Sequence, residues 1–166
     1  MLQSNQFLVT EEEISVIMYR KGVSALIINK KRELLLVNLV SFNEEFFAVP
    51  GGGIEEGETL EEAVYREIQE ELGINKNSLE FVGKTIFPLK FKFKVIKMTR
   101  NGVNYEGSER YFFGFLFTGD DSEIKFIDGE VRTYKWVPQA QLKDYLLFDN
   151  QLQETLEKIA EIFPDL

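Results

Sequence analysis

Apolar and polar residues alternate along the first fifty positions in a way that predicts strands. Residues 13–20 and 22–28 are strand-like, and the polar turn 29–33 leads into the apolar run 34–40, so we expect an opening antiparallel pair. The segment "FFAVP", residues 46–50, predicts a short strand that brings the chain to a cluster of three glycines.

Four later segments rich in aromatic and β-branched residues also predict strands. They are residues 79–87, 90–98, 110–118 and 130–137. Asn101 and Gly102, between the second and third of these segments, predict a tight hairpin turn.

Between these groups of strands the apolar period changes to that of a helix, from Thr59 to Leu72. Thr59 is a natural N-cap, Glu62 completes a capping box, and Gly73 can end the helix in a left-handed conformation with Ile74 folded back. Residues 139–147 and 150–163 predict two closing helices. The order of elements predicts an α+β fold, an α/β/α sandwich around a mostly antiparallel or mixed sheet.

Composition limits both the architecture and the chemistry. A length of 166 residues with 44% hydrophobic content fits one domain, residues 1–166. The chain has no Cys and no His, which excludes disulfides, Cys–His and Ser–His pairs and the usual zinc ligands. Since no run is apolar enough to span a membrane and no signal peptide is evident, we expect a soluble, cytoplasmic protein.

The net charge of −9 means that a polyanionic ligand needs a local basic patch or bound cations. The central helix favours bound cations over a basic patch, because Glu67, Glu70 and Glu71 share one of its faces at positions i, i+3 and i+4. Three neighbouring carboxylates repel one another unless a hard cation such as Mg²⁺ or Mn²⁺ lies between them.

Residues around the helix fit the same hypothesis. Gly51, Gly52 and Gly53 lack side chains, so their backbone groups can approach a metal ion or a phosphate. Arg66 can steer a glutamate or contact a phosphate. Taken alone, "REIQEEL" would be an ordinary solvated amphipathic helix.

The spacing of the whole stretch makes the metal hypothesis stronger. It reads Gly, five residues, Glu, seven residues, then Arg-Glu-aliphatic-any-Glu-Glu-any-Gly-aliphatic, from Gly52 through Glu58 to Ile74. This pattern resembles the Nudix box of the Nudix hydrolases and is complete. Two segments outside the box are also similar to the family. One is "FFAVPGG", with Phe47 where many members have Trp, and the other is the late strand "GEVRTYKWV", in which an acidic residue precedes Trp136.

The resemblance implies a metal-dependent pyrophosphohydrolase that cleaves nucleoside diphosphates linked to another group. It makes Glu67, Glu70 and Glu71 metal ligands for Mg²⁺ or Mn²⁺, with a backbone carbonyl of Gly51 or Gly52 as a further ligand. It also gives Arg66 the role of orienting a glutamate and Glu58 a structural role.

Water would then attack phosphorus with the help of a carboxylate base, because the chain has no histidine. Glu70 and Glu130 are the two candidates for this base. We favour Glu130, six residues before Trp136, as the outlying acid, although a plain surface charge would explain it equally well.

Residues 84–100 hold six cations and no acid. On a strand, Lys90, Lys92 and Lys94 share one face and Phe91 and Phe93 the other. An edge strand guarded by lysines explains this pattern more simply than a phosphate-binding face does. In the functional interpretation, Lys90 and Lys92 draw in a polyphosphate, and Phe87, Phe91 or Phe112 stacks a base, with Phe47 also in the substrate site.

The substrate stays open within the family. We rank nucleoside triphosphates and dinucleoside polyphosphates first, narrowly ahead of ADP-ribose and nucleotide sugars, and do not favour an RNA 5′ end. A nucleotide-binding sensor without catalysis is the alternative from another class, but it would not need every glutamate of the box. The oligomeric state is open, with a homodimer as one option.

Overall fold

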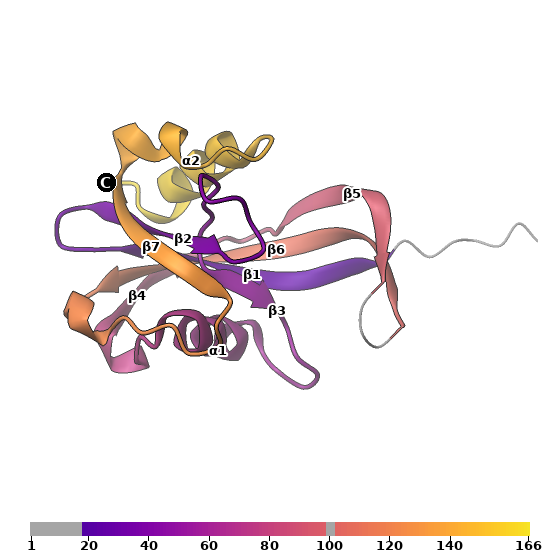
Figure 1. Ribbon diagram of the computed structural model, residues 1–166, viewed down its shortest axis with the longest axis horizontal. Helices are drawn as coiled ribbons and strands as arrows, with labels where there is room; N and C mark the ends of the chain where they lie inside the picture. Colours follow the sequence, from indigo (N-terminus) through magenta and orange to yellow (C-terminus); the bar gives the residue numbers. More distant parts are fainter. Residues whose placement is uncertain (1–17, 99–101) are drawn as a thin grey trace, which may run out of the picture.

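The residues that the structure describes, 18–98 and 102–166 of a computed structural model, form a seven-stranded sheet with a helix on each face (Figure 1). The strands are β1 (Tyr19–Ile28), β2 (Glu33–Leu39), β3 (Gly51–Gly53), β4 (Leu79–Lys84), β5 (Leu89–Met98), β6 (Asn104–Phe117) and β7 (Val131–Pro138). Their order is β4-β6-β1-β2-β7, with β3 paired to β1 and β5 to β6. β1 and β6 are parallel and the other described pairs are antiparallel, which confirms the predicted mixed sheet and the opening antiparallel pair.

The alternation of side chains along β1 explains the two helical layers. Val23, Ala25 and Ile27 point into one apolar cluster, which the helix α1 (Leu60–Leu72) completes with residues such as Ile68. Leu26 and Ile28 point into the opposite cluster, which the helix α2 (Gln151–Ile162) covers. Burial of both faces makes a sheet of this kind the centre of an α/β/α sandwich, as predicted.

The helix α1 begins and ends as its sequence predicts. The Thr59 hydroxyl accepts a hydrogen bond from the backbone N–H of Glu62 at 3.2 Å, and the Glu62 carboxylate accepts one from the N–H of Thr59 at 2.8 Å. Gly73 adopts a left-handed φ of 65° and donates its N–H to the Gln69 carbonyl, while Ile74 is buried. These caps hold the helix at defined ends, so the positions of its glutamates are set.

Short 3₁₀ helices occupy several connections: η1 (Lys76–Ser78), η2 (Asp121–Glu123) and η3 (Gln139–Asp144). The prediction of a helix over residues 139–147 was wrong in type, because the segment forms the 3₁₀ helix η3, which ends at Asp144. Only Leu142 and Leu146 of this segment are buried. The second closing helix is confirmed as α2. No helix in the described part of the chain is long and apolar enough to cross a membrane.

The segment before the glycines corrects the prediction of a strand at residues 46–50. Ala48 forms an isolated bridge with Val37, and Phe47 donates its N–H to the carbonyl of Tyr145 instead. The strand is formed by the glycines themselves, as β3, which pairs with residues 22–24 of β1. At Gly51 an added Cβ would lie 2.1 Å from the Val23 carbonyl oxygen, so the absence of a side chain permits this pairing.

The strands β5 and β6 form a hairpin that extends beyond the body of the sheet (Figure 1). We call β5 and the facing residues 104–110 of β6 the arm. The hairpin is confirmed, although Asn101 of its predicted turn and residues 13–17 of the first predicted strand lie outside the described residues. Lys90 and Lys92 face Glu109 and Gly107 and share a face, as predicted, but the register shifts between Lys92 and Lys97.

Candidate active site

Arg66 lies at the centre of the carboxylate cluster on α1. Its Nε and Nη2 donate to the two oxygens of Glu58 at 2.7 and 2.9 Å, and Nη2 also reaches the carbonyl of Gly53 at 2.8 Å. Its Nη1 donates to Glu67 at 3.0 Å and to Glu70 at 3.2 Å. The two bonds to Glu58 fix the guanidinium and lower the pKa of Glu58, so the remaining N–H groups can orient the two glutamates of the helix.

Glu67 lies against the glycine strand β3. A Cβ at Gly52 would lie 2.2 Å from Oε1 of Glu67, so the carboxylate occupies the space that any side chain would need. Burial raises the pKa of Glu67, while the Arg66 guanidinium opposes this and the nearby carboxylates of Glu70 and Glu130 add to it.

Glu71 is the most deeply buried carboxylate of the box, with 2% of its surface exposed. Its Oε2 accepts a hydrogen bond from the Gly51 N–H at 3.1 Å. Burial raises the pKa of Glu71 to about 8, against the effect of that hydrogen bond, and the charges of Glu67, Asp128 and Glu130 raise it further. A bound cation would remove this penalty by compensating the charge.

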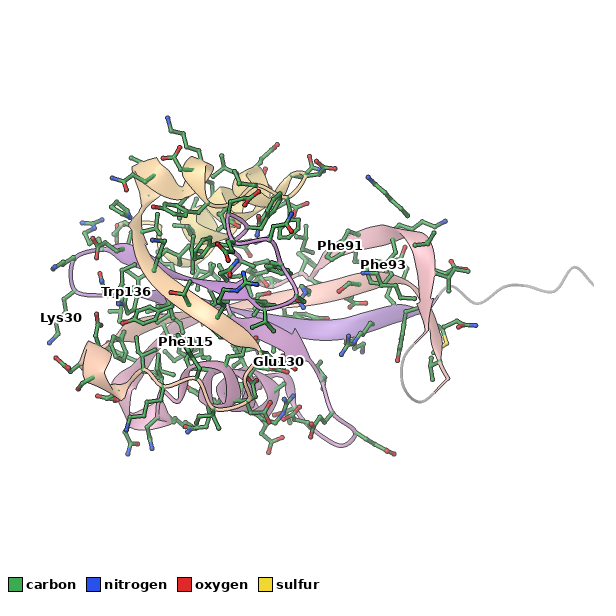
Figure 2. All side chains as sticks on the ribbon, viewed as in Figure 1. Lys30, Phe91, Phe93, Phe115, Glu130 and Trp136 are labelled. Carbon is green, nitrogen blue, oxygen red and sulfur yellow. The ribbon has the colours of Figure 1, made fainter. Side chains whose placement is uncertain are left out.

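The two candidate bases differ in exposure and in origin. The side chain of Glu70 is 46% exposed, although Arg66 contacts it, and the side chain of Glu130 is exposed. Glu130 comes from the loop after η2, whose Lys125 and Asp128 donate their backbone N–H groups to the carbonyls of Leu72 and Glu70. These bonds hold the loop along the end of α1, so Glu130 lies near the cluster (Figure 2).

The donor set suits a hard divalent cation, because every group is a carboxylate or backbone oxygen and β3 leaves no side chain between them. Among the residues of 18–98 and 102–166, no three carboxylates are already close enough together to hold an ion. In this arrangement Arg66 contacts Glu67 and Glu70, while the Gly51 N–H binds Glu71. A bound ion would therefore compete with Arg66 for two of its ligands.

The sequence interpretation missed two arginines beside the glycine strand, Arg20 and Arg110, whose Nη2 atoms would lie 2.6 and 3.7 Å from Cβ atoms added at Gly53 and Gly22. Arg110 is partly buried and donates from Nη1 to the Val23 carbonyl at 3.0 Å and to the Ser24 hydroxyl at 2.8 Å. Burial and the charge of Arg20 lower the pKa of Arg110, and Glu67 and Glu71 oppose that shift. A single arginine at the head of the apolar run "RYFFGFLF" was the available signal.

Two of the predicted substrate residues lie in the core. Phe112 is 5% exposed and packs in the cluster under α2, so the structure contradicts its use as an open stacking surface. Phe47 is also buried, edge-to-face with Tyr145 at 5.4 Å, but it lines a cleft of about 460 Å³ with Lys135 and Arg132. Its ring can thus form only a wall of that cleft.

The other predicted substrate residues lie on the arm or just before it. Phe91 is 41% exposed, and Phe87 is exposed in the loop before β5. Lys90 extends into solvent 3.8 Å from Glu109, and the side chain of Lys92 is exposed. The structure therefore separates a carboxylate site on α1 from a basic and aromatic surface on β5.

Comparisons with known proteins agree with this geometry. The model of the NUDIX domain matches residues 18–159. The chain is 32% identical to the RNA pyrophosphohydrolase of Orientia tsutsugamushi (strain Boryong), covering 87% of this chain and 91% of that protein, and 30% identical to the one of Roseobacter denitrificans, covering 83% and 88%. The fold resembles a C. elegans Ap4A hydrolase binary complex, with a TM-score of 0.67 and 19% identity over 89% of this chain and 99% of that chain. It also resembles the E. coli dihydroneopterin triphosphate pyrophosphohydrolase, with a TM-score of 0.65 and 18% identity over 90% and 99%.

Proposed function

The chain belongs to the Nudix hydrolase family and is a pyrophosphohydrolase, and from that premise we propose that it hydrolyses the 5′-triphosphate end of RNA with the help of a divalent cation. The names of its full-length relatives support this substrate over the nucleoside and dinucleoside polyphosphates that the sequence alone ranked first. Dinucleoside polyphosphates are the second candidate, because the partly exposed ring of Phe91 offers a surface on which a second base can stack.

The observation that carries the proposed reaction is the placement of three carboxylates of α1 beside β3: Arg66 contacts Glu67 and Glu70, and Glu71 binds the Gly51 N–H. These three carboxylates, with a backbone carbonyl of Gly51 or Gly52, would hold Mg²⁺ or Mn²⁺. When bound, the cation polarises phosphate oxygens and lowers the pKa of a water molecule.

The protein side chains supply position and proton transfer. Arg66 is anchored on Glu58, so it holds Glu67 and Glu70 at a fixed distance from β3. Glu130 or Glu70 accepts the proton of the attacking water, and Glu130 is favoured because no hydrogen bond to its carboxylate restrains it among the described residues. Arg110 and Arg20 place positive charge beside the carboxylates, where the phosphates of a substrate would lie.

The test is release of phosphate or pyrophosphate from triphosphorylated RNA, nucleoside triphosphates, dinucleoside polyphosphates and ADP-ribose, with Mg²⁺ or Mn²⁺. Glu70→Gln and Glu130→Gln are compared with Glu80→Gln, an exposed residue on β4 that serves as the control. We expect Glu130→Gln to lower kcat at least about 100-fold, in line with the loss of general-base catalysis. Glu70→Gln should lower kcat at least as much, because it removes a ligand of the cation, and Glu80→Gln should leave kcat unchanged.

Two results would contradict the proposal. Turnover of nucleotides but not of triphosphorylated RNA would assign another substrate to the same site. Near wild-type turnover by folded Glu70→Gln would remove Glu70 from the mechanism, and the same result for Glu130→Gln would leave Glu70 as the base.

A further inference from the structure

The arm concentrates positive charge on an acidic protein. β5 carries Lys90, Lys92, Lys94 and Lys97 and no acid, and residues 104–110 of β6 add Arg110, Glu106 and Glu109, so the arm has a formal charge of +3 although the whole chain has a net charge of −9. The side chains of Lys90 and Lys94 are 60% and 96% exposed, and the acidic oxygens near them, on Glu109 and Asp149, lie 3.8 and 3.9 Å away. Exposed contacts of this length neutralise little charge, so the arm presents a positive surface.

Two aromatic rings and the cation of Lys97 lie together on one face of the arm, while Lys90 and Lys92 lie on the other face of the same edge strand. The rings of Phe91 and Phe93, labelled in Figure 2, lie edge-to-face with their centres 5.9 Å apart. Nζ of Lys97 is 4.6 Å from the centre of the Phe93 ring. Phe91 faces Ser108 of β6, and Ser108 faces Arg20 of β1, so Arg20 lies on the same row of the sheet as Phe91. Rings for stacking beside cations for phosphates are the usual elements of a single-strand nucleic-acid surface.

This surface is connected to the carboxylate site through the sheet. Leu89, at the start of β5, faces Arg110, Arg110 faces Gly22, and Gly22 faces Gly53 of the box. Three strand spacings of about 4.8 Å put Leu89 about 14 Å from Gly53, and the ten residues of β5 then extend outward for about 33 Å. A polymeric ligand whose end is held at the glycine strand can therefore continue along the arm.

We propose that the arm binds the RNA chain downstream of its 5′ end, with Phe91 and Phe93 stacking bases and the lysines contacting phosphates. The inference rests on the proposed function, because it requires a polymeric substrate. An acidic protein or an anionic lipid surface would also meet the lysines, but neither would use the continuity between the arm and the glycine strand.

The experiment compares a short and a long substrate. A Lys94→Ala, Lys97→Ala double variant is assayed on triphosphorylated RNA of 2 and of 12 unpaired nucleotides. The matched control is Lys30→Ala, Lys31→Ala, two exposed lysines in the β1–β2 turn at the opposite end of the sheet, where Figure 2 labels Lys30.

For the arm variant we expect kcat/KM to fall at least about fivefold on the 12-mer and to stay within twofold on the dinucleotide. The slope of log kcat/KM against log salt should become shallower by about 1.4, since each lost phosphate contact on a single strand accounts for about 0.7. Phe93→Ala should lower kcat/KM on the 12-mer about tenfold, because a stacking surface is lost, with a smaller change in the salt slope. If the arm variant lost kcat/KM equally on both RNAs, or lost none on the 12-mer, the proposal would be overturned.

Binding of a 12-mer with a 5′-hydroxyl, followed by fluorescence anisotropy, separates failure of the arm proposal from failure of the proposed function. The arm is expected to bind this RNA more weakly in the double variant even though no hydrolysis occurs. Wild-type protein that cleaves only nucleotides and binds no 12-mer would refute both proposals. Two results would refute the arm proposal alone. One is cleavage of both RNAs with no effect of the double variant, and the other is a double variant that loses only its binding to anionic lipid vesicles.

Discussion

At the scale of single residues, Glu71 shows how burial decides the properties of a carboxylate. Its pKa is raised to about 8 by burial, whereas in the unfolded chain the pKa returns to an ordinary value near 4.5. Between these two values the folded, metal-free protein keeps a proton that the unfolded chain has lost. The free energy of unfolding must therefore fall as pH rises through that window.

We predict that metal-free protein loses up to about 1.4 kcal/mol of stability per pH unit between pH 5 and 8 on account of Glu71. Glu71→Gln keeps an acceptor for the Gly51 N–H and cannot ionise, so this part of the pH dependence should disappear. Urea unfolding in EDTA at several pH values measures it. A variant with the same slope as the wild type would show that the slope comes from other groups.

Gly52 gives a second prediction at this scale. Gly52→Ala puts a Cβ onto the carboxylate of Glu67, which is the free end of a flexible side chain and can move away. Stability should change by less than about 1 kcal/mol, while divalent metal affinity, measured by calorimetry, should drop at least tenfold. Gly83→Ala is the control, because its Cβ would meet nothing closer than 3.7 Å, and equal metal affinity in both variants would contradict the prediction.

At the scale of elements, the end of α1 and the loop that carries Glu130 depend on each other. Gly73 ends the helix at a φ of 65°, and a Cβ there would lie 2.8 Å from the carbonyl oxygen of Lys125. That carbonyl belongs to the loop whose N–H groups bind the end of α1. A change at the helix cap should therefore reach the active site through the backbone.

We predict that Gly73→Ala destabilises the protein by about 1–3 kcal/mol, the range for a non-glycine residue held in a left-handed conformation. It should also lower kcat more than metal affinity, because the loop of Glu130 moves while the box ligands stay in place. Thr59→Ala, at the opposite end of the helix, should cost about 1 kcal/mol and leave kcat unchanged. If both variants lower kcat equally, the loop has no special role.

At the scale of the whole molecule, the carboxylate site joins elements that are distant in sequence. β3, α1 and the loop before β7 each supply part of it. A cation bound among them stabilises the folded protein against the unfolded chain, where the site does not exist.

We expect Mn²⁺ at about 100 times its Kd to add about 2.7 kcal/mol of stability and to raise Tm by about 5–10 °C for a protein of this size. The increase should be absent in a Glu67→Gln, Glu70→Gln variant and present in Glu80→Gln, as measured by thermal unfolding. An equal increase in all three proteins would place the bound ion elsewhere.

Local patterns in the sequence determined most of the elements. The capped helix, the hairpin of β5 and β6 and the mixed sheet followed from periodicity, caps and turn residues, which act between neighbours in the chain. The spacing of Glu67, Glu70 and Glu71 also predicted their common face, because a helix converts spacing directly into direction.

Only the tertiary structure decided the contacts between distant segments. The glycines became a strand because β1 approaches them, Phe112 was buried because α2 covers its face of the sheet, and Arg110 reached the site across β1. Burial and approach of this kind depend on how layers pack, which no local pattern records. The spacing of the carboxylates was therefore evident in the chain, while the surroundings that tune their pKa values and hold Arg66 and Arg110 arose from packing.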